Sequence, residues 1–114
     1  MHEKSSKSAS LIRFRPKPDA LLRHIRRLTA EGAIGYLDHS LLERMPERGF
    51  DVFDVQSVLR TGQISGPIDP GKNPGEWKVK LVSCLENTTR KMGVVVIVIR
   101  DKRLLIKTTE WEDR

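Results

Sequence analysis

The sequence predicts an α+β fold, in which two to three N-terminal helices pack on an antiparallel meander sheet of three or more strands. Two observations support this prediction. Apolar residues recur at helical spacing over residues 18–62, whereas from residue 77 onwards they alternate with polar residues or run continuously, as in strands. One change from helical to extended spacing is typical of an α+β domain, and 114 residues suffice for one domain.

The first helix is predicted from about Pro18 to Glu31. Proline is favoured in the first turn of a helix, where its missing N–H costs nothing, and Gly32 provides the stop. Upstream, residues 11–14 predict a short strand that Pro16 closes. The apolar stripe of the helix consists of Leu21, Leu22, Ile25 and Leu28.

A second helix is predicted after a short extended piece at residues 34–37. Ser40 and Glu43 have the spacing of a capping box, in which the serine hydroxyl accepts from an early backbone N–H and the glutamate reaches back. Pro46 removes a helical hydrogen bond, so we expect a kink or a one-turn start there. Gly49 ends the helix.

A third helix is predicted to begin after Asp51, whose carboxylate caps the first turn. Phe50 and Val55 have the spacing of a hydrophobic staple across that cap, and Gly62 ends the helix. The residues expected to face the core are Val55, Val58 and Leu59.

Three strands are predicted after an irregular loop rich in glycine and proline, which covers residues 63–76. Residues 77–86 alternate between apolar and polar side chains, and residues 94–99 are apolar on both faces. Residues 103–111 form the last strand. The continuous apolar run predicts the central strand of a meander, and the helices are expected to cover its apolar face.

Net positive charge is concentrated at one end of the chain. The formal charge is +6, and residues 1–30 contain eight of the 21 Lys and Arg residues but only two of the 15 Asp and Glu residues. The rest of the chain is therefore neutral overall, and the basic end indicates a surface for a polyanion or an acidic partner. We expect a flexible basic N-terminal arm at residues 1–17 and one domain at residues 18–114, although a solubilising tail also explains the charge.

Composition excludes several classes of protein. A single cysteine rules out an intramolecular disulfide framework, and the longest apolar run, residues 94–99, is far shorter than the roughly 20 residues that span a bilayer. No signal-peptide core follows Met1, so we expect a cytoplasmic protein without membrane contact. The three histidines are too scattered for a metal set, so no metal and no cofactor are expected, and Cys84 is expected to be a buried thiol.

The segment at residues 39–49 holds the strongest candidates for chemistry. Arg44 and Arg48 lie four residues apart, so on a helix they share a face and can grip phosphate oxygens. Histidine is the side-chain type best suited to proton transfer near neutral pH, and His39 lies just upstream. Glutamates alternate with the arginines, so the segment is also consistent with solvated ion pairs of small energetic value.

The pattern His-x4-Arg-Met-x2-Arg-Gly at residues 39–49, followed by a helix that ends Leu-x-x-Gly at residues 59–62, resembles an uncharacterised bacterial domain family. That family is grouped with small toxins of the RelE and BrnT kind. The order of elements is also similar to that of the MqsR-type toxins, with a basic helix, two short helices and a sheet that begins at Trp77. The likeness covers roughly residues 18–112.

The resemblance implies a RelE-like fold and a toxin-type endoribonuclease that cleaves messenger RNA, free or on the ribosome, without a metal. It also implies a cognate antitoxin that covers the site. Sites of this kind stabilise the pentavalent phosphate with Arg and Lys side chains, often beside a tyrosine or a carboxylate that acts as the base. MqsR-type toxins carry a tyrosine at the position that matches Val96, whereas the one tyrosine of this chain is Tyr36.

Cleavage of RNA requires a base for the 2′-OH, an acid for the leaving oxygen and cations for the phosphorane. We assign proton transfer to His39 with Glu110 as a carboxylate partner, and phosphate binding to Arg44 and Arg48. The auxiliary cations are Lys78, Lys80 and Lys107. The nucleic-acid-binding candidates are Arg23, Arg26, Arg27 and Lys80, with Trp77 and Trp111 as rings that either stack on unpaired bases or pack in the core.

Two other interpretations remain open. The first is a module of the same fold that binds nucleic acid or a partner protein without catalysis, which the absence of a matching tyrosine and the basic N-terminal end favour. The second is an interaction domain whose sheet edge accepts an added strand. Salt-sensitive RNA binding that persists without Arg44 would identify the first.

Overall fold

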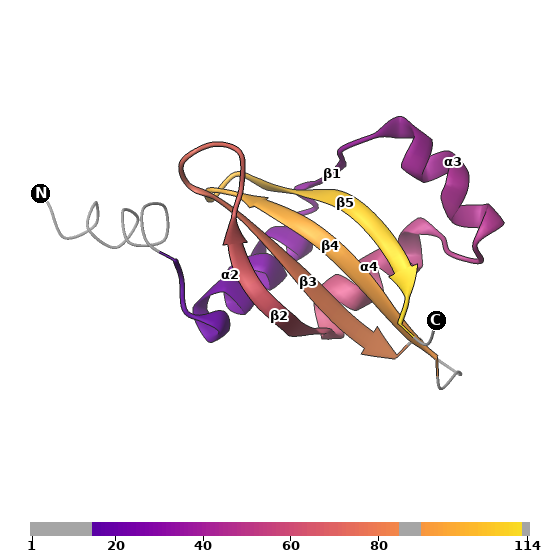
Figure 1. Cartoon of the computed structure of the whole chain (residues 1–114), viewed down its shortest axis with the longest axis horizontal. Helices are drawn as coiled ribbons and strands as arrows, with labels where there is room; N and C mark the ends of the chain where they lie inside the picture. Colours follow the sequence, from indigo (N-terminus) through magenta and orange to yellow (C-terminus); the bar gives the residue numbers. More distant parts are fainter. Residues whose placement is uncertain (1–14, 85–89, 113–114) are drawn as a thin grey trace, which may run out of the picture.

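Five strands form one sheet in the order β1-β5-β4-β3-β2 (Figure 1). The computed structural model describes residues 15–84 and 90–112, apart from the side chain of His39, so the strand predicted at residues 11–14 lies outside the described residues. The four long strands are antiparallel to one another and the short strand β1 is parallel to β5. The strands are β1 (Ile34–Tyr36), β2 (Gln63–Pro70), β3 (Glu76–Cys84), β4 (Lys91–Ile99) and β5 (Arg103–Trp111).

The α+β class is confirmed and β4 is the central strand as predicted, but the sheet is mixed, because β1 adds to one edge parallel to β5 while β2 to β5 form an antiparallel meander. Residues 63–70, predicted as loop, form the edge strand β2 along β3. The register shifts between Ser65 and Asp69, and Gly66 in this stretch has φ 87°. Glycine and proline signalled a loop because both weaken a strand, yet an edge strand with a bulge tolerates them.

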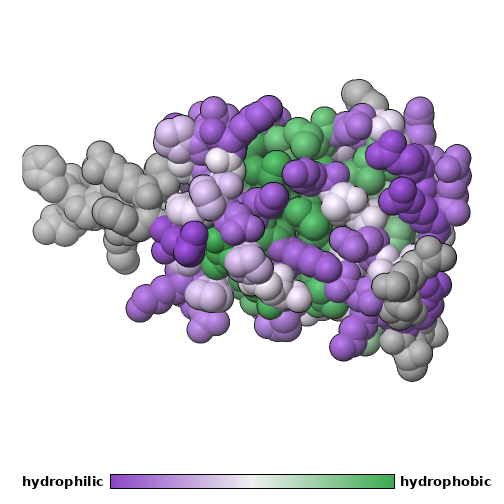
Figure 2. All heavy atoms as spheres, viewed as in Figure 1, coloured by the Kyte–Doolittle hydropathy of each residue, from purple (hydrophilic) through white to green (hydrophobic). Residues whose placement is uncertain are grey.

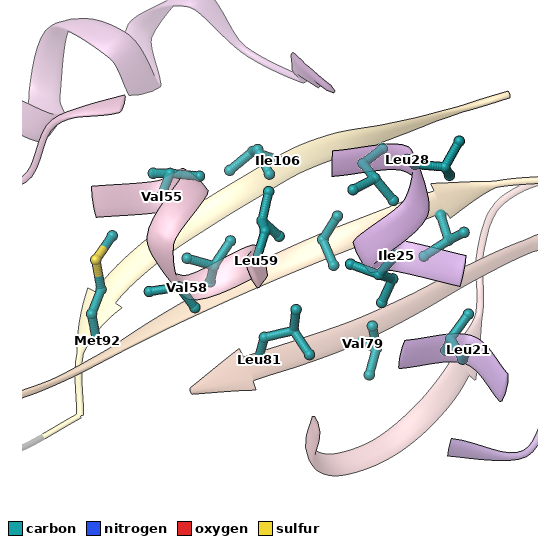
Figure 3. Close-up of a cluster of buried hydrophobic side chains, with 14 of the residues drawn as sticks. Leu21, Ile25, Leu28, Val55, Val58, Leu59, Val79, Leu81, Met92 and Ile106 are labelled. Atoms are coloured by element: carbon teal, nitrogen blue, oxygen red, sulfur yellow. The ribbon is translucent and has the colours of Figure 1, made fainter. Parts of the chain in front are cut away.

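Helices α2 (Pro18–Ala30) and α4 (Val52–Thr61) cover one face of the sheet (Figure 1). Their apolar stripes meet the inward side chains of β3, β4 and β5 in a single core (Figure 3). Each large aliphatic side chain that is fully buried contributes roughly 1.5–3 kcal/mol. The fully buried residues of this core include Leu21, Ile25, Leu28, Val55, Val58, Leu59, Leu81, Met92 and Ile106.

The ends of α4 form as predicted. The carboxylate of Asp51 accepts from the backbone N–H of Asp54 at 2.9 Å, and the Asp54 carboxylate accepts from the N–H of Asp51 at 3.1 Å. Gly62 follows the last turn, and a Cβ there would lie 2.6 Å from the Val58 carbonyl oxygen. Only glycine fits this close approach, so the chain can pass directly from α4 into β2.

Helix α3 (His39–Glu47) lies beyond the edge of the sheet (Figure 1). Its cap is Asp38, whose carboxylate accepts from the backbone N–H of Ser40 at 2.9 Å, so the capping box predicted from Ser40 is wrong. Pro46 lies in the last turn and Gly49 follows with φ 86°, which ends the helix at the predicted place. Because aspartate is as good a cap as serine, neighbouring candidates could not be ranked by spacing alone.

Thr109 is a polar side chain in the core. It is 0% exposed, and its hydroxyl has no hydrogen-bond partner among the described residues. An unpaired buried hydroxyl costs about 1–3 kcal/mol, so Thr109→Val, which substitutes a methyl group of similar size, is expected to raise the free energy of unfolding by about 1 kcal/mol. Urea denaturation measures the change.

Thr29 provides a matched control, because its buried hydroxyl donates to the carbonyl oxygen of Ile25 at 2.8 Å. Thr29→Val removes a satisfied hydroxyl and is expected to give no increase in stability. A Thr109→Val protein less stable than the wild type would contradict the assignment of an unpaired hydroxyl.

Candidate functional site

The face of the sheet turned away from α2 and α4, which we call the open face, carries hydrophilic side chains over a partly apolar floor (Figure 2). Strand alternation places Lys78 and Lys80 on this face, because Val79 and Leu81 between and beside them point into the core. Figure 2 shows hydrophobic surface between the hydrophilic side chains. The half-buried residues of this floor are Val95, Ile97, Ile99 and Leu105.

Lys107 reaches the open face at a β-bulge in β5. Val95 pairs with Thr108 and Val96 pairs with Ile106, so Lys107 has no paired residue on β4. A bulge inserts one residue and redirects the side chains around it. As a result, Lys107 and Thr108 line the same cavity on the open face although they are neighbours in the chain.

Two adjoining cavities on the open face bring three predicted cations together. Their volumes are about 370 Å³ and 480 Å³, and Lys78 and Lys107 line both of them. Lys80 lines the larger cavity. The smaller one includes Leu37, which is 51% exposed, together with apolar side chains of β4 and β5. The arrangement can hold an anion that also offers apolar or weakly polar surface.

The charges on the open face are only partly compensated. The Lys80 ammonium lies 2.7 Å from a Glu112 carboxylate oxygen and 4.0 Å from one of Glu110, and its hydrogen bond to Glu112 raises the pKa of Lys80 above the ordinary value. Lys80 is therefore a fixed cation at neutral pH. Within residues 15–84 and 90–112, Lys78 and Lys107 form no ion pair, so their charges are available to a ligand.

The arginines of the segment at residues 39–49 lie at the edge of the sheet. Arg44 donates to the Ser40 hydroxyl at 3.0 Å along α3. Arg48 follows the last turn of α3, and its carbonyl oxygen accepts from the indole N–H of Trp111 at 2.8 Å. His39 begins α3, but its side chain lies outside the described part of the structure, so its predicted role in proton transfer stays a prediction.

A third cavity, of about 560 Å³, brings together Arg48 and Glu110, two of the predicted site residues. Trp111 and Arg90 line it as well, and the Arg90 guanidinium carbon lies 3.8 Å from the centroid of the Trp111 ring. Phe50 packs on the same indole with ring centroids 4.6 Å apart. Trp111 thus already contacts a cation and a second ring. Arg90 was not among the predicted site residues, because the pairing of β4 with β5 brings it to Trp111.

Trp77 and Tyr36 lie on the core side of the sheet and not on the open face. Trp77 is 8% exposed, so it is a core residue and offers no ring for an unpaired base, which corrects the stacking assignment. Tyr36 packs against the core, and burial, together with the nearby charge of Asp51, raises the pKa of its hydroxyl. A tyrosine in this position is a poor base at neutral pH.

The basic residues of α2 lie on the other side of the sheet from the three lysines. Arg23 is exposed to solvent. Arg26 donates to the carbonyl oxygen of Gly62 at 3.0 Å, which connects α2 to the end of α4. Arg27 donates to His24 and forms an exposed ion pair with Glu31 at 3.2 Å. The predicted nucleic-acid-binding arginines and lysines therefore do not form one continuous surface.

Among the described residues, no group of three His, Cys, Asp or Glu side chains is placed to hold a metal ion. None of the described helices combines the length and the apolar character needed to cross a bilayer. Cys84, predicted to be buried, ends β3 and is exposed. The prediction rested on the usual burial of free cysteines, whereas strand alternation places Cys84 on the same face as Lys78 and Lys80.

No protein-family model, curated protein sequence or solved structure matches this chain. The predicted resemblance of residues 39–49 to an uncharacterised bacterial domain family therefore stays a prediction.

Arg26 stabilises the fold through its contact with Gly62, whereas Arg23 of the same helix is a surface residue. Arg26→Ala is expected to lower the free energy of unfolding by about 1–2 kcal/mol, because a hydrogen bond from a charged donor is lost and the carbonyl of the buried Gly62 is left without it. Arg23→Ala removes an exposed side chain of the same helix and is expected to change stability by less than about 0.5 kcal/mol. Chemical denaturation of both proteins provides the comparison, and equal effects would contradict it.

Proposed function

We propose that this protein is a toxin-type endoribonuclease that cleaves RNA on the open face of its sheet, with ammonium groups neutralising the phosphate. The observation that carries the proposal is the convergence of Lys78, Lys80 and Lys107 on two adjoining cavities. A cationic face with an apolar floor suits an extended single strand, whose phosphates meet the lysines while sugars and bases lie on the floor. The resemblance at residues 39–49 supports the same function.

In the proposed reaction the 2′-OH of the RNA loses its proton to a base and attacks the adjacent phosphorus. The bond from phosphorus to the 5′ oxygen breaks, and the products carry a 2′,3′-cyclic phosphate and a 5′-OH. Glu110 is the proposed base, because its side chain is 49% exposed and lies beside Lys80 on the open face. Lys80, whose ammonium lies 4.0 Å from Glu110, and Lys107, which lines the same cavity as Lys80, stabilise the charge of the phosphorane, and one of these ammonium groups protonates the leaving 5′ oxygen.

Arg48 extends the proposed site towards α3. It lines the same cavity as Glu110, so an RNA strand that passes over Glu110 reaches its guanidinium. Guanidinium groups bind phosphate in a two-pronged geometry that lysine does not offer. We assign Arg48, which follows α3, to a neighbouring phosphate of the strand, with Arg44 and His39 farther away within α3.

We propose a cognate antitoxin as the partner of this protein. The floor of the open face is apolar and its rim is basic, which suits a protein segment with alternating apolar and acidic residues. Such a segment would cover Lys78 and Lys107 and compete with RNA for them.

A specific observation also favours binding without catalysis. The described residues that line the two open-face cavities include no histidine and no tyrosine. A surface of lysines and apolar side chains can bind nucleic acid without a side chain that acts as a catalytic base. The alternative function is therefore a non-catalytic nucleic-acid-binding or partner-binding module of the same fold.

The purified protein is expected to cleave single-stranded RNA in the presence of EDTA and to leave 2′,3′-cyclic phosphate ends. Lys107→Gln is expected to lower the cleavage rate by about 10²–10³, because a cation that stabilises the phosphorane is lost. Denaturing gels of a labelled RNA measure the rate, and the chemistry of the product ends identifies the reaction.

Lys102→Gln is the matched control, since Lys102 is exposed in the turn between β4 and β5 and its removal changes the net charge equally. Its cleavage rate is expected to equal that of the wild type. Equal losses in both variants would indicate a general charge effect and contradict the site. Salt-sensitive RNA binding without cleavage by the wild type would reject the ribonuclease and support the non-catalytic module.

A further inference from the structure

Gly93 occupies a position where glycine is ordinarily unfavourable, in the interior of the central strand β4. It pairs with Val82 on one side and with Glu110 on the other. A Cβ added at Gly93 would lie 2.6 Å from a Glu112 carboxylate oxygen and 2.9 Å from the Lys80 side-chain carbon next to the ammonium. The space above this glycine is therefore filled by an ion pair, and any larger residue would displace it.

The ion pair over Gly93 joins the two strands on either side of β4. Lys80 belongs to β3 and Glu112 follows β5, and their charged atoms lie 2.7 Å apart. Glu110 lies 4.0 Å from the same ammonium. The two carboxylates also differ in exposure, since the side chain of Glu112 is 20% exposed and that of Glu110 is 49% exposed.

We propose that Glu112 is a positioning residue, which holds the Lys80 ammonium over Gly93 and so keeps the carboxylate of Glu110 free to take the proton of the RNA 2′-OH. This inference rests on the proposed function, in which Glu110 is the base. The Lys80 ammonium lies 4.0 Å from Glu110, so it can move onto the Glu110 carboxylate if its shorter contact with Glu112 is removed. A carboxylate that accepts a charge-assisted hydrogen bond from lysine has an oxygen occupied and is a weaker base.

The separation of the two carboxylates also explains why both are present. Glu112 neutralises Lys80 at short distance, whereas Glu110 stays exposed beside a cation that the RNA phosphate can share. Glu112 was not among the predicted site residues, although its spacing of two residues from Glu110 places both on the same face of an extended chain.

Two variants break the ion pair in different ways. Glu112→Gln removes the charge that holds Lys80. Gly93→Ala keeps every charge but inserts a methyl group into the pair, and the atoms it meets are the ends of flexible side chains, so the sheet can remain folded. Asp101→Asn, in the exposed turn between β4 and β5, changes the net charge as Glu112→Gln does and serves as the control.

Steady-state cleavage of a labelled RNA is expected to show kcat lowered about 10-fold or more in Glu112→Gln and in Gly93→Ala, with KM unchanged or lower, because the base is occupied while the cations that bind RNA remain. Asp101→Asn is expected to keep both constants. A merely structural role would reduce the folded fraction and would not separate kcat from KM. Unchanged kcat in both pair-breaking variants, with an active wild type, would overturn the proposal.

Crystal structures of the wild type and of Glu112→Gln test the placement without relying on activity. The distance from the Lys80 ammonium to the nearest Glu110 oxygen is expected to fall from 4.0 Å to about 2.7–2.9 Å in the variant. A Lys80 that stays away from Glu110 would overturn the positioning role. A wild type that cleaves no RNA would reject the proposed base instead, and the two failures are therefore distinguishable.

Discussion

The packing of α2 and α4 on one face of the sheet is the constraint on which the rest of the structure depends. The helices bury one side of β4, yet this strand is apolar on both sides, so Val95 and Ile97 are left on the open face without a helix above them. The long lysine side chains of the neighbouring strands lie beside them, and the aliphatic stems of lysines can cover apolar surface while their ammonium groups stay in water. The same one-sided packing thus creates both the apolar floor and its basic rim.

Sequence patterns of a few residues correctly predicted the ends of α4, which depend on interactions between residues close in the chain. The cap at Asp51 and the stop at Gly62 follow from hydrogen bonds within a few residues, and α4 forms where they place it. The edge strand β2 depends on pairing with β3, and no local pattern encodes that pairing, whereas β1 forms within the extended piece predicted at residues 34–37. Gly66 and its neighbouring prolines indicated a loop, whereas β3 provides a partner that draws residues 63–70 into the sheet.

The part of the candidate site that depends on spacing within one strand was predictable, whereas the part that depends on strand pairing was not. Lys78 and Lys80 alternate with core residues, so their common face follows from the period of a strand. The place of Lys107 beside them depends on a bulge, and a bulge is set by the pairing of two strands. The arginines of α2 were grouped with the lysines by charge alone, although the layer order of helix and sheet places the two sets on opposite sides.

The bulge in the edge strand β2 also affects whether the sheets of two molecules can pair edge to edge. Pro67 and Pro70 lack the N–H that an added strand would need, and the turn at Gly66 interrupts a flat edge. At the opposite edge β1 covers only part of β5, and Thr109 beyond it is 0% exposed. Among the described residues neither edge is a long flat template, so edge-to-edge growth into aggregates is disfavoured and other molecules are met through side chains on the face.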